Sequence, residues 1–549
     1  MFFIHRKESY VSPTIQPREF VDEFQGYYES EIVAVKLDNI IRDLQTQVGT
    51  SRNMEFIELN TEEGWRVYRR SVEFVLIVAV YELYPNSEVV AKFRSSGGLY
   101  CEINVPDKPL DDEMVKEIEL YMRKIVQENR PIVKEVRKKK DVVKMFEGFN
   151  LAEKASLIDT LDKEYVSIYR CGEFYDYFYG PMMGSTGHLG NFAIESFNSG
   201  ILLFTPDMRS GGKIPRLVKQ PKLSRMLAEA KSWGDILHCN YITDLNRFIK
   251  NGTIGEVIRI SEALQEKCIA EIADHIAMDS DKLRLILIAG PSSSGKTSFA
   301  QRLRIQLRVV GLEPISISLD DYFCNREDTP KLPNGTYDYE CLEALDVKLF
   351  NENILSLMQG EKVMLPRYNF ITGKREWDKC NTISLPSGQP IIVEGIHGLN
   401  EKLTAAVPRD MKYKIYISPL SQLNIDAHNR IPSTDARMLR RLVRDYKTRG
   451  ADALKTLNKW PDVRAGEEKY IFPYQEEADV MFNSALIYEI AALQKYAVPL
   501  LKTVTPEFPE YTKARRILDF CEYFYDLPNE DMIPNNSILR EFIGNSVFF

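Results

Sequence analysis

The second half of the chain alternates short apolar runs with amphipathic stretches. Five of the runs have the length of buried strands, and they cover residues 285–289, 314–319, 389–393, 411–417 and 478–482. Segments with helical periodicity separate them. Strands that alternate with helices are typical of an α/β domain with a parallel sheet. We therefore expect a parallel five-stranded sheet within residues 281–549.

The first 60 residues show a different pattern. Strand-like runs at 31–37 and 54–59 flank a polar stretch at 38–48, whose composition suggests a short helix. Strands and a helix within so short a segment predict a small α+β module over residues 1–60.

Residues 61–225 open with a helix that has a wide apolar face. A second helix is predicted over 109–130, where Met114, Ile118 and Met122 recur at a spacing of four. Residues 226–280 are interpreted as a helical linker that ends in an amphipathic helix at 256–278.

A phosphate-binding motif follows the strand at 285–289. The sequence Gly290-Pro-Ser-Ser-Ser-Gly-Lys-Thr297 matches G-x-x-x-x-G-K-[ST] and leads into an amphipathic helix. Backbone N–H groups of such a loop turn toward phosphate oxygens, while the lysine reaches the outer phosphates and the threonine hydroxyl ligates Mg²⁺. We predict an ATP site at Gly290, Ser292, Ser293, Ser294, Gly295, Lys296, Thr297 and Ser298.

Acidic residues follow two of the apolar runs. Asp320 and Asp321 come after the run at 314–319, and Glu394 follows the run at 389–393. Ligands of open α/β sheets bind just outside the carboxyl ends of the strands. Thr297, Asp320 and Glu394 are therefore the predicted Mg²⁺ ligands. Neighbouring side chains of an extended segment point opposite ways, so only one of the two aspartates is expected to face the crevice. Each acid, taken alone, would also suit a turn or a helix cap.

The most basic segment of the chain lies at 429–450. Helical spacing puts four arginines on one face: Arg437, Arg440, Arg441 and Arg444. Ser433 or Thr434 is expected to cap the start of this helix and Gly450 to end it. Guanidinium groups pair well with phosphate oxygens, which favours a mobile lid over the nucleotide. The alternative is a solvated surface helix.

Bulk properties restrict the partners. The 549-residue chain has a net charge of −8, which argues against a general affinity for nucleic acid or for anionic membranes. Its eight cysteines form no C-x-x-C pair, the first residues lack a signal-peptide core, and the run at 74–80 is too short to span a bilayer. A cytoplasmic protein with a small-molecule partner is expected. Homo-oligomerisation stays open.

Over residues 281–500 these motifs resemble the uridine kinase and phosphoribulokinase family. The resemblance rests on the P-loop, on Asp320-Asp-Tyr-Phe323, Tyr337-Asp-Tyr339, Pro366-Arg-Tyr-Asn-Phe370 and Glu394-Gly-Ile396, and on the arginine segment that ends at Gly450. It implies that Asp320 is the general base, that Asp338 holds ribose hydroxyls and that Tyr368 lines the base pocket. Arg441, Arg444 and Arg449 are implied to bind phosphates or substrate, with Arg444 assisting catalysis.

This chain departs from the family at two positions that concern nucleobase recognition. Gly373 stands where uridine kinases carry a base-reading histidine, and Ala451 stands where they carry an arginine.

Residues 1–225 resemble the two N-terminal domains of threonyl-tRNA synthetase, the ubiquitin-like TGS module and the editing domain. The resemblance rests on the helix around Ser71, the strand at 98–103, the helix at 109–130 and the turn Gly180-Pro-x-x-x-Ser-Thr-Gly187. The synthetase editing site uses H-x-x-x-H and C-x-x-x-H pairs. The corresponding residues here are Arg70, Phe74, Phe178 and Met182. The resemblance therefore implies an inherited scaffold, spanning 61–225, without hydrolytic chemistry.

Together the two resemblances match a long bacterial form of uridine or nucleoside kinase. The predicted activity is ATP- and Mg²⁺-dependent phosphorylation of a hydroxyl, with the 5′-hydroxyl of a pyrimidine nucleoside as the leading acceptor. The alternatives are a kinase for another sugar or polyol and a nucleotide-dependent regulator that binds tRNA.

Overall fold

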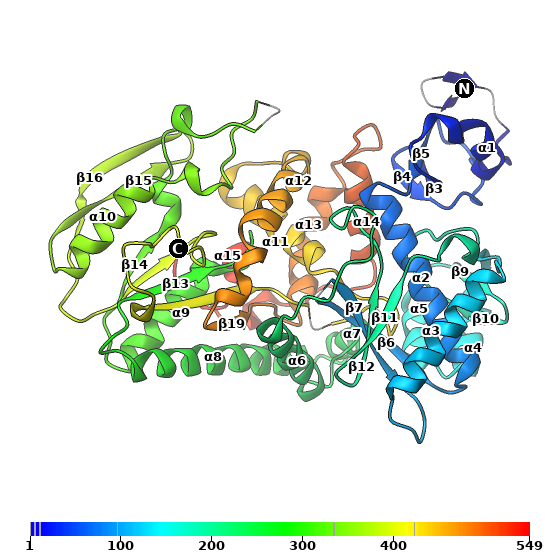
Figure 1. Ribbon diagram of the computed structural model, residues 1–549, viewed down its shortest axis with the longest axis horizontal. Coiled ribbons are helices and arrows are strands. Elements are labelled where there is room, and N and C mark those ends of the chain that lie inside the picture. The colour runs from blue at the N-terminus through cyan, green and yellow to red at the C-terminus, as the bar shows by residue number, and fades with distance from the viewer. Residues whose placement is uncertain (1, 5–6, 10–11, 96, 333–334, 422) are drawn as a thin grey trace.

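The computed structural model describes residues 2–4, 7–9, 12–95, 97–332, 335–421 and 423–549 (Figure 1). The expectation that the first residues lack a signal-peptide core concerns a segment that lies partly outside the described residues. The P-loop sheet lies at one end of the molecule, and the N-terminal module lies at the opposite end (Figure 1).

The N-terminal module is a five-stranded sheet with the order β2-β1-β5-β3-β4. Its elements are β1 (Phe2–Ile4), β2 (Lys7–Ser9), α1 (Val21–Phe24), β3 (Ile32–Leu37), β4 (Ile40–Arg42) and β5 (Asn53–Glu58). The prediction of a helix at 38–48 is wrong. Asp38 and Asn39 both have positive φ, 49° and 60°, and form the two-residue turn of a β3–β4 hairpin. Asn and Asp tolerate this conformation well, so the polar stretch encodes a turn.

The next region places two long helices against a four-stranded sheet of order β11-β12-β7-β6. Its elements are α2 (Glu62–Leu83), β6 (Glu88–Ser95), β7 (Gly98–Asn104), α3 (Asp112–Gln127), β11 (Ala193–Phe197) and β12 (Gly200–Phe204). The apolar stripes of α2 and α3 share one buried cluster with β6, β7 and β12, as the predicted helical periodicity requires. A smaller sheet, β10-β9-β8, adjoins them and consists of β8 (Val133–Lys138), β9 (Tyr165–Cys171) and β10 (Phe174–Asp176), flanked by α4 (Lys139–Gly148) and α5 (Ala152–Thr160).

Three helices lead to the P-loop sheet: α6 (Pro221–Ile236), α7 (Ile242–Lys250) and α8 (Ile254–Met278). Ile269 and Ile276 of α8 lie in the same hydrophobic cluster as Ile286 and Phe299 beside the P-loop. Ile158 and Ile168 of the preceding region belong to that cluster too. These helices therefore share a core with both neighbours instead of forming a free linker.

The expected five-stranded parallel sheet is present, with the order β14-β17-β13-β18-β19. The strands are β13 (Leu285–Ala289), β14 (Ile315–Ser318), β17 (Ile391–Glu394), β18 (Lys412–Ser418) and β19 (Val480–Asn483). The helices are α9 (Lys296–Val309), α10 (Val347–Met358), α11 (Ser433–Arg449), α12 (Ala453–Tyr470), α13 (Glu489–Leu501), α14 (Tyr511–Cys521) and α15 (Arg540–Ile543). A hairpin of β15 (Val363–Asn369) and β16 (Lys374–Ile383) projects beside α10 (Figure 1).

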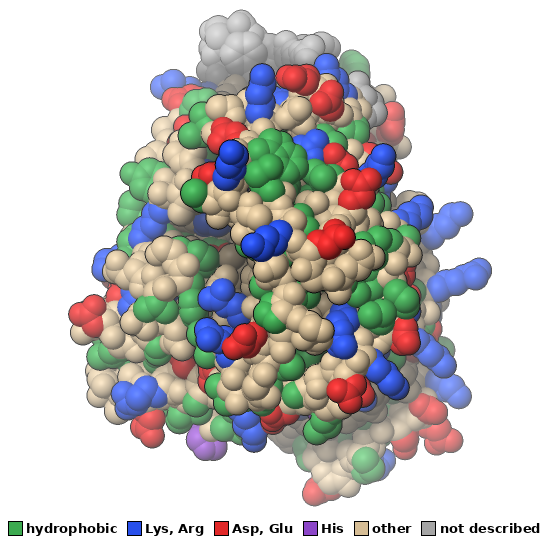
Figure 2. Space-filling model, turned by 90° about the vertical axis from the view of Figure 1, so that its left-hand side faces the viewer, with side chains coloured by type: hydrophobic (Ala, Val, Ile, Leu, Met, Phe, Trp, Pro, Cys, Tyr) green, Lys and Arg blue, Asp and Glu red, His purple; other side chains and the backbone are tan. Residues whose placement is uncertain are grey.

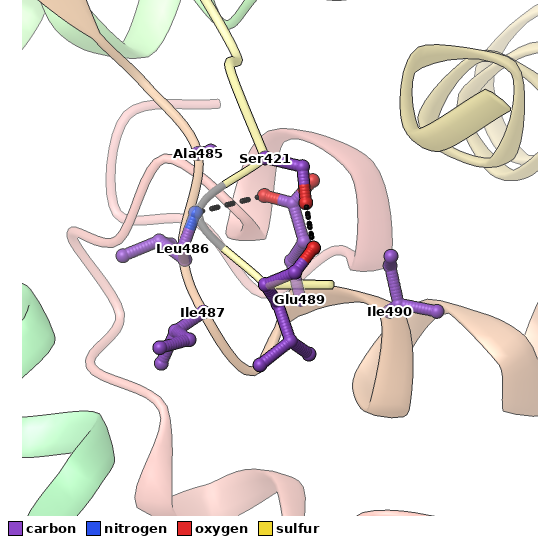
Figure 3. Close-up of a pocket in the computed structure, with 7 residues that line it drawn as sticks. Ser421, Ala485, Leu486, Ile487, Glu489 and Ile490 are labelled. Atoms are coloured by element: carbon purple, nitrogen blue, oxygen red, sulfur yellow. Dashed lines mark hydrogen bonds between the residues drawn. The ribbon is translucent and has the colours of Figure 1, made fainter. Parts of the chain in front are cut away.

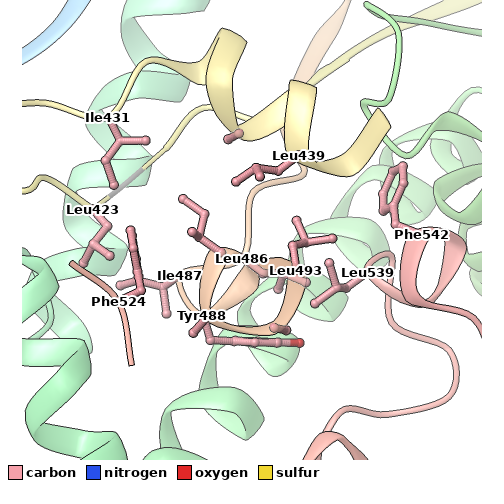
Figure 4. Packing of buried hydrophobic residues seen from close by; sticks show 14 of the residues in the cluster. Leu423, Ile431, Leu439, Leu486, Ile487, Tyr488, Leu493, Phe524, Leu539 and Phe542 are labelled. Carbon is pink, nitrogen blue, oxygen red and sulfur yellow. The ribbon is translucent and has the colours of Figure 1, made fainter. Parts of the chain in front are cut away.

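Helix α11 is buried, which contradicts the expectation of a mobile or solvated lid. Leu439 packs among residues of α13 and of the C-terminal segment, including Leu493, Leu539 and Phe542 (Figure 4). Ser433 is already the first helical residue, and neither Ser433 nor Thr434 caps the helix, because the N-cap position is taken by Pro432. Gly450 ends the helix in the left-handed conformation, φ 60°, as predicted.

Buried charges join the two halves of the molecule. Lys154 on α5 and Asp176 on β10 form an ion pair, and the His428 Nδ1 atom lies 2.7 Å from Asp176 Oδ2 and 2.9 Å from Lys154 Nζ. Asp426 lies 3.4 Å from the same ammonium group. All four side chains are almost fully buried. Across the described residues, no helix combines the length and the apolar character that crossing a bilayer requires.

Candidate active site

The P-loop joins β13 to α9 and has a backbone that few other residues could adopt. A Cβ atom at Gly290 would lie 2.0 Å from the Ile417 carbonyl oxygen, so only glycine fits beside β18. Gly295 has a φ of 83° and Ser293 a φ of 61°. These left-handed residues turn successive N–H groups toward one side of the loop, which is the geometry of an anion-binding nest.

Carboxylates from distant parts of the chain accept the loop's hydrogen bonds. The Ser292 N–H donates to Glu467 Oε1 over 3.0 Å. The Ser298 N–H and hydroxyl both donate to Glu541 Oε2, over 3.1 and 2.9 Å. Lys296 Nζ donates to the Gly290 and Pro291 carbonyl oxygens at 3.1 and 3.3 Å. The loop therefore binds anionic oxygen, and its donors suit phosphate.

Sequence reasoning missed Glu467 and Glu541. Glu541 belongs to the C-terminal segment, whose role the sequence left open. Ile538 of that segment contacts Gly295 so closely that a Cβ there would lie 2.4 Å from Ile538 Cγ2. Because Ser298 and Glu541 are 243 positions apart, no local pattern pointed to this contact.

Oxygen ligands gather where the predicted metal site lies. Glu394 Oε1 is 3.5 Å from Thr297 Oγ1 and accepts a 3.0 Å hydrogen bond from the Ser318 hydroxyl. Burial and the nearby charge of Asp320 raise the pKa of Glu394 to about 7. A cation would relieve this crowding of negative charge, and hard oxygen donors suit Mg²⁺. The described residues contain no cluster of three His, Cys, Asp or Glu side chains arranged for a metal, so protein ligands alone would leave coordination positions for water or phosphate.

Asp320 and Asp321 face different surroundings, although the segment is not extended as the sequence suggested. Residues Leu319–Tyr322 form a 3₁₀ turn. Asp320 is exposed, and its charge acts on Glu394 of the metal site. Asp321 is half-buried and accepts the Tyr368 N–H over 3.2 Å. Asp320 is thus the aspartate on the P-loop side.

The predicted acceptor residues lie next to this turn. The ring of Tyr368 packs 5.5 Å from that of Phe323 and 5.1 Å from that of Phe370. Its buried hydroxyl has no hydrogen-bond partner among the described residues, which leaves a donor for a bound molecule. Asp338 accepts the Glu340 N–H over 3.1 Å.

Glu340 is a further residue that the sequence did not single out. Burial raises the pKa of its carboxyl to about 7, and the charges of Arg441, Asp320 and Lys296 act on it. Glu340 therefore lies between the P-loop and the arginines of α11.

The arginines of α11 divide into two sets. Arg441 donates to the Ser292 hydroxyl over 2.7 Å, which places it at the P-loop as predicted. Asp445 pairs with Arg441, Arg444 and Arg449, at 3.2, 2.9 and 3.7 Å. Asp445 therefore holds the three arginines that were assigned to phosphate or substrate.

Arg437 and Arg440 also reach the P-loop, donating to the Ser292 and Ser293 carbonyl oxygens over 3.2 and 3.4 Å, but each is paired with a buried carboxylate. Arg437 pairs with the buried Glu467, and Arg440 pairs with the buried Glu489. Glu489 also accepts the Leu486 N–H over 2.9 Å beside a small pocket with mainly aliphatic walls (Figure 3). These two arginines neutralise buried carboxylates and fix α11 in place.

On the face turned toward the reader in Figure 2, basic and acidic side chains are interspersed. No single-sign field of the kind that attracts nucleic acid covers this face.

The four editing-site positions come together in the structure. The rings of Phe74 and Phe178 are 5.6 Å apart, Met182 is buried, and Arg70 donates to the Pro181 carbonyl oxygen over 2.6 Å. None of these side chains is a metal ligand or a proton-transfer group at neutral pH. These four side chains pack together at the positions that form the editing site in the synthetase.

A parallel sheet with a P-loop after its central strand, β13, and acids at the ends of β17 and β14 defines the class of P-loop nucleotide-binding proteins. Residues 285–491 match the model of the Phosphoribulokinase / Uridine kinase family, and this part of the chain is a domain of that family.

The N-terminal region matches threonine–tRNA ligases. That of Rubrobacter xylanophilus is 32% identical over 166 residues, which cover 30% of this chain and 26% of the ligase. That of Gluconobacter oxydans is 33% identical over 159 residues, 29% of this chain and 24% of the ligase. This chain thus spans about a quarter of the length of these relatives.

Among solved structures, the one described as "a Possible Uridine Kinase from Bacillus stearothermophilus" is 19% identical. It aligns with 37% of this chain and 89% of its own, at a TM-score of 0.24.

Proposed function

We propose that this protein is an ATP-dependent small-molecule kinase. The observation that supports it best is the P-loop, whose Ser292 and Ser298 donors hold anionic oxygens while Thr297 and Glu394 face each other 3.5 Å apart. The match of residues 285–491 to a kinase family model agrees with this assignment.

The proposed roles follow from position. Lys296 would exchange its two carbonyl partners for the outer phosphates. Thr297, Glu394 and Asp320 would hold Mg²⁺, which when bound neutralises charge on the phosphates. Arg441 and Arg444, held by Asp445, would contact phosphate oxygens and stabilise charge during transfer.

Asp320 is proposed as the general base. It is the exposed aspartate of the 3₁₀ turn and lies at the end of β14, beside the metal site. Its carboxylate would accept the proton of the acceptor hydroxyl as the oxygen attacks the γ-phosphorus, and the bond from that phosphorus to the β–γ bridging oxygen would break to release ADP.

The leading acceptor is the 5′-hydroxyl of a pyrimidine nucleoside. Tyr368 supports an aromatic ligand, because its ring packs among other aromatic rings and its hydroxyl lacks a partner in the part of the chain that the structure describes. Asp338 would hold vicinal hydroxyls, and Arg449 would reach the substrate from α11. A sugar or polyol acceptor is the alternative, because Gly373 and Ala451 lack nucleobase-reading side chains.

The test is ADP release by the full chain across uridine, cytidine, purine nucleosides, sugars and polyols, with ATP and Mg²⁺. Turnover with uridine or cytidine, absent in Lys296→Ala, supports the proposal. Turnover with a sugar but with no nucleoside would show that the acceptor is a sugar. No turnover with any of these acceptors, by protein that binds ATP, would contradict the kinase assignment.

A further inference from the structure

Three arginines outside the kinase site have no partner within the described part of the chain. They are Arg69 on α2, Arg94 on β6 and Arg430 in the segment that leads into α11. Each is half-buried, and the side chain of none makes a hydrogen bond or an ion pair there. Buried charges in proteins are normally paired, so three unpaired guanidinium groups need an explanation.

The chain brings the three arginines together across the contact between its two halves. The Ala91 N–H donates to the Ala427 carbonyl oxygen over 2.8 Å, and Asn424 Nδ2 donates to the Ala91 carbonyl oxygen over 2.7 Å. Arg94 lies three residues beyond Ala91 on β6, and Arg430 lies three residues beyond Ala427.

Helix α2 supplies the third arginine to the same place. Arg94 pairs across the sheet with Leu99, which packs in the cluster under α2, so Arg94 lies on the α2 side of the sheet. Arg69 projects from that helix. Burial lowers the pKa of Arg94, and the positive charges of Arg69 and Arg430 lower it further, as close like charges do.

The nearby acids do not balance this group. Glu73, one turn beyond Arg69, acts electrostatically on Arg94 and Arg430, which lower its pKa, but burial outweighs them and raises that pKa to about 7. Glu73 forms no ion pair within the described residues. Asp207 is engaged by Arg209 and Ser210, and Asp435 by Arg516. A guanidinium does not lose its proton under physiological conditions, so the positive charge stays.

We propose that Arg69, Arg94 and Arg430 form a binding site for a phosphate-bearing small molecule, separate from the P-loop. Guanidinium forks bind phosphate oxygens in pairs, and three of them suit a doubly charged group. The half-buried position under α2 admits a small anion better than a nucleic-acid strand, and the chain's net charge of −8 also disfavours a polyanion.

The test is calorimetric titration of the full chain with inorganic pyrophosphate. Wild-type protein should show binding that survives in Lys296→Gln, where the P-loop is impaired. In the Lys296→Gln background, this binding should weaken about tenfold to a hundredfold when Arg94→Gln or Arg430→Gln is added, because each loses hydrogen bonds to a charged group. Arg52→Gln removes an exposed arginine of the N-terminal module and should bind like wild type.

A thermal readout separates lost binding from misfolding. Without pyrophosphate, Arg94→Gln should unfold at or above the wild-type temperature, since one repelling charge is gone. With pyrophosphate, wild type and the Lys296 and Arg52 variants should gain stability, whereas the double variant Lys296→Gln/Arg94→Gln, in which both phosphate sites are impaired, should gain little. Binding that persists in Arg94→Gln and Arg430→Gln and disappears in Lys296→Gln would overturn the proposal. If tRNA displaces pyrophosphate from the wild-type protein and no longer binds to Arg94→Gln, the proposal is overturned, and the site binds the phosphate-bearing end of a nucleic acid instead.

Discussion

Replacing Glu541 with glutamine tests how the C-terminal segment acts on the P-loop. Glu541 Oε2 accepts two hydrogen bonds from Ser298, at 3.1 and 2.9 Å, at the third residue of α9. An incoming phosphate would need the same donors at the positive end of the helix. In the proposed kinase, the carboxylate therefore competes with the nucleotide, and Glu541→Gln should increase nucleotide affinity.

The magnitude follows from the bonds that weaken. A hydrogen bond to a charged group contributes about 1.5–3 kcal/mol, against roughly 1 kcal/mol for a neutral one. The substitution keeps the shape of the side chain and removes the charge from the acceptor of both bonds. The charge accounts for about 0.5–2 kcal/mol of each bond, so the competing state loses about 1–4 kcal/mol, which corresponds to about a fivefold to several-hundredfold lower Kd for ADP.

The assay is equilibrium binding of a fluorescent ADP analogue to the wild type, Glu541→Gln and Asp531→Asn. Asp531 is an exposed acid ten residues earlier, so its variant controls for the general loss of a negative charge. An unchanged or weaker affinity in Glu541→Gln, with Asp531→Asn at the wild-type value, would refute the reasoning. Glu541 would then act as a cap of α9 that stays in place when nucleotide binds.

Three further predictions address the proposed chemistry. Lys296→Ala should abolish phosphoryl transfer with little change in the unfolding temperature, because the hydrogen bonds of its ammonium group to described residues go to two loop carbonyls; unchanged turnover would remove the P-loop from the mechanism. Asp320→Asn should lower kcat by about 10²–10⁴ while ATP binding largely survives. If Asp321→Asn proves to be the crippled variant and Asp320→Asn turns over normally, the general base is misassigned. The full chain should not deacylate seryl-tRNA, since Phe74 and Phe178 fill the editing positions, and measurable hydrolysis would show chemistry that these residues do not supply.

Local patterns were enough to predict the sheet and the P-loop. The apolar run at 285–289 and the glycines at 290 and 295 each encode their own conformation, so strand, loop and helix follow from neighbouring residues. Glu394 was found in the same way, because it directly follows an apolar strand. These features are short-range, and the structure reproduces them.

The features that the sequence did not predict depend mainly on contacts between residues far apart in the chain. Helix α11 has a basic composition that suits a solvated lid, but Arg437 and Arg440 neutralise Glu467 and Glu489, which lie 30 and 49 positions away. The polar run that starts at Asp38 suggested a helix by composition, while its two positive φ values produce a hairpin. Composition reports the average environment of a segment, whereas ion pairs and backbone handedness at single residues fix its structure.

The contact between the two halves argues that the N-terminal region is part of the working molecule. Removing His428 and Asp426 would strip the buried Lys154–Asp176 ion pair of its other polar partners, which a buried pair needs to offset its desolvation. The same loop is hydrogen-bonded to β6 through Ala427 and continues through Arg430 into α11.

That continuity reaches the P-loop. Helix α11 carries Arg441 to the Ser292 hydroxyl and Arg437 to Glu467, which accepts the Ser292 N–H. A displacement of Arg430 by a ligand bound at the arginines of the front half would therefore be transmitted along one buried helix to the loop that the nucleotide needs. Because α11 is packed on both sides, it would move as a rigid element, and this gives the synthetase-like scaffold a physical route to act on the kinase site without any chemistry of its own.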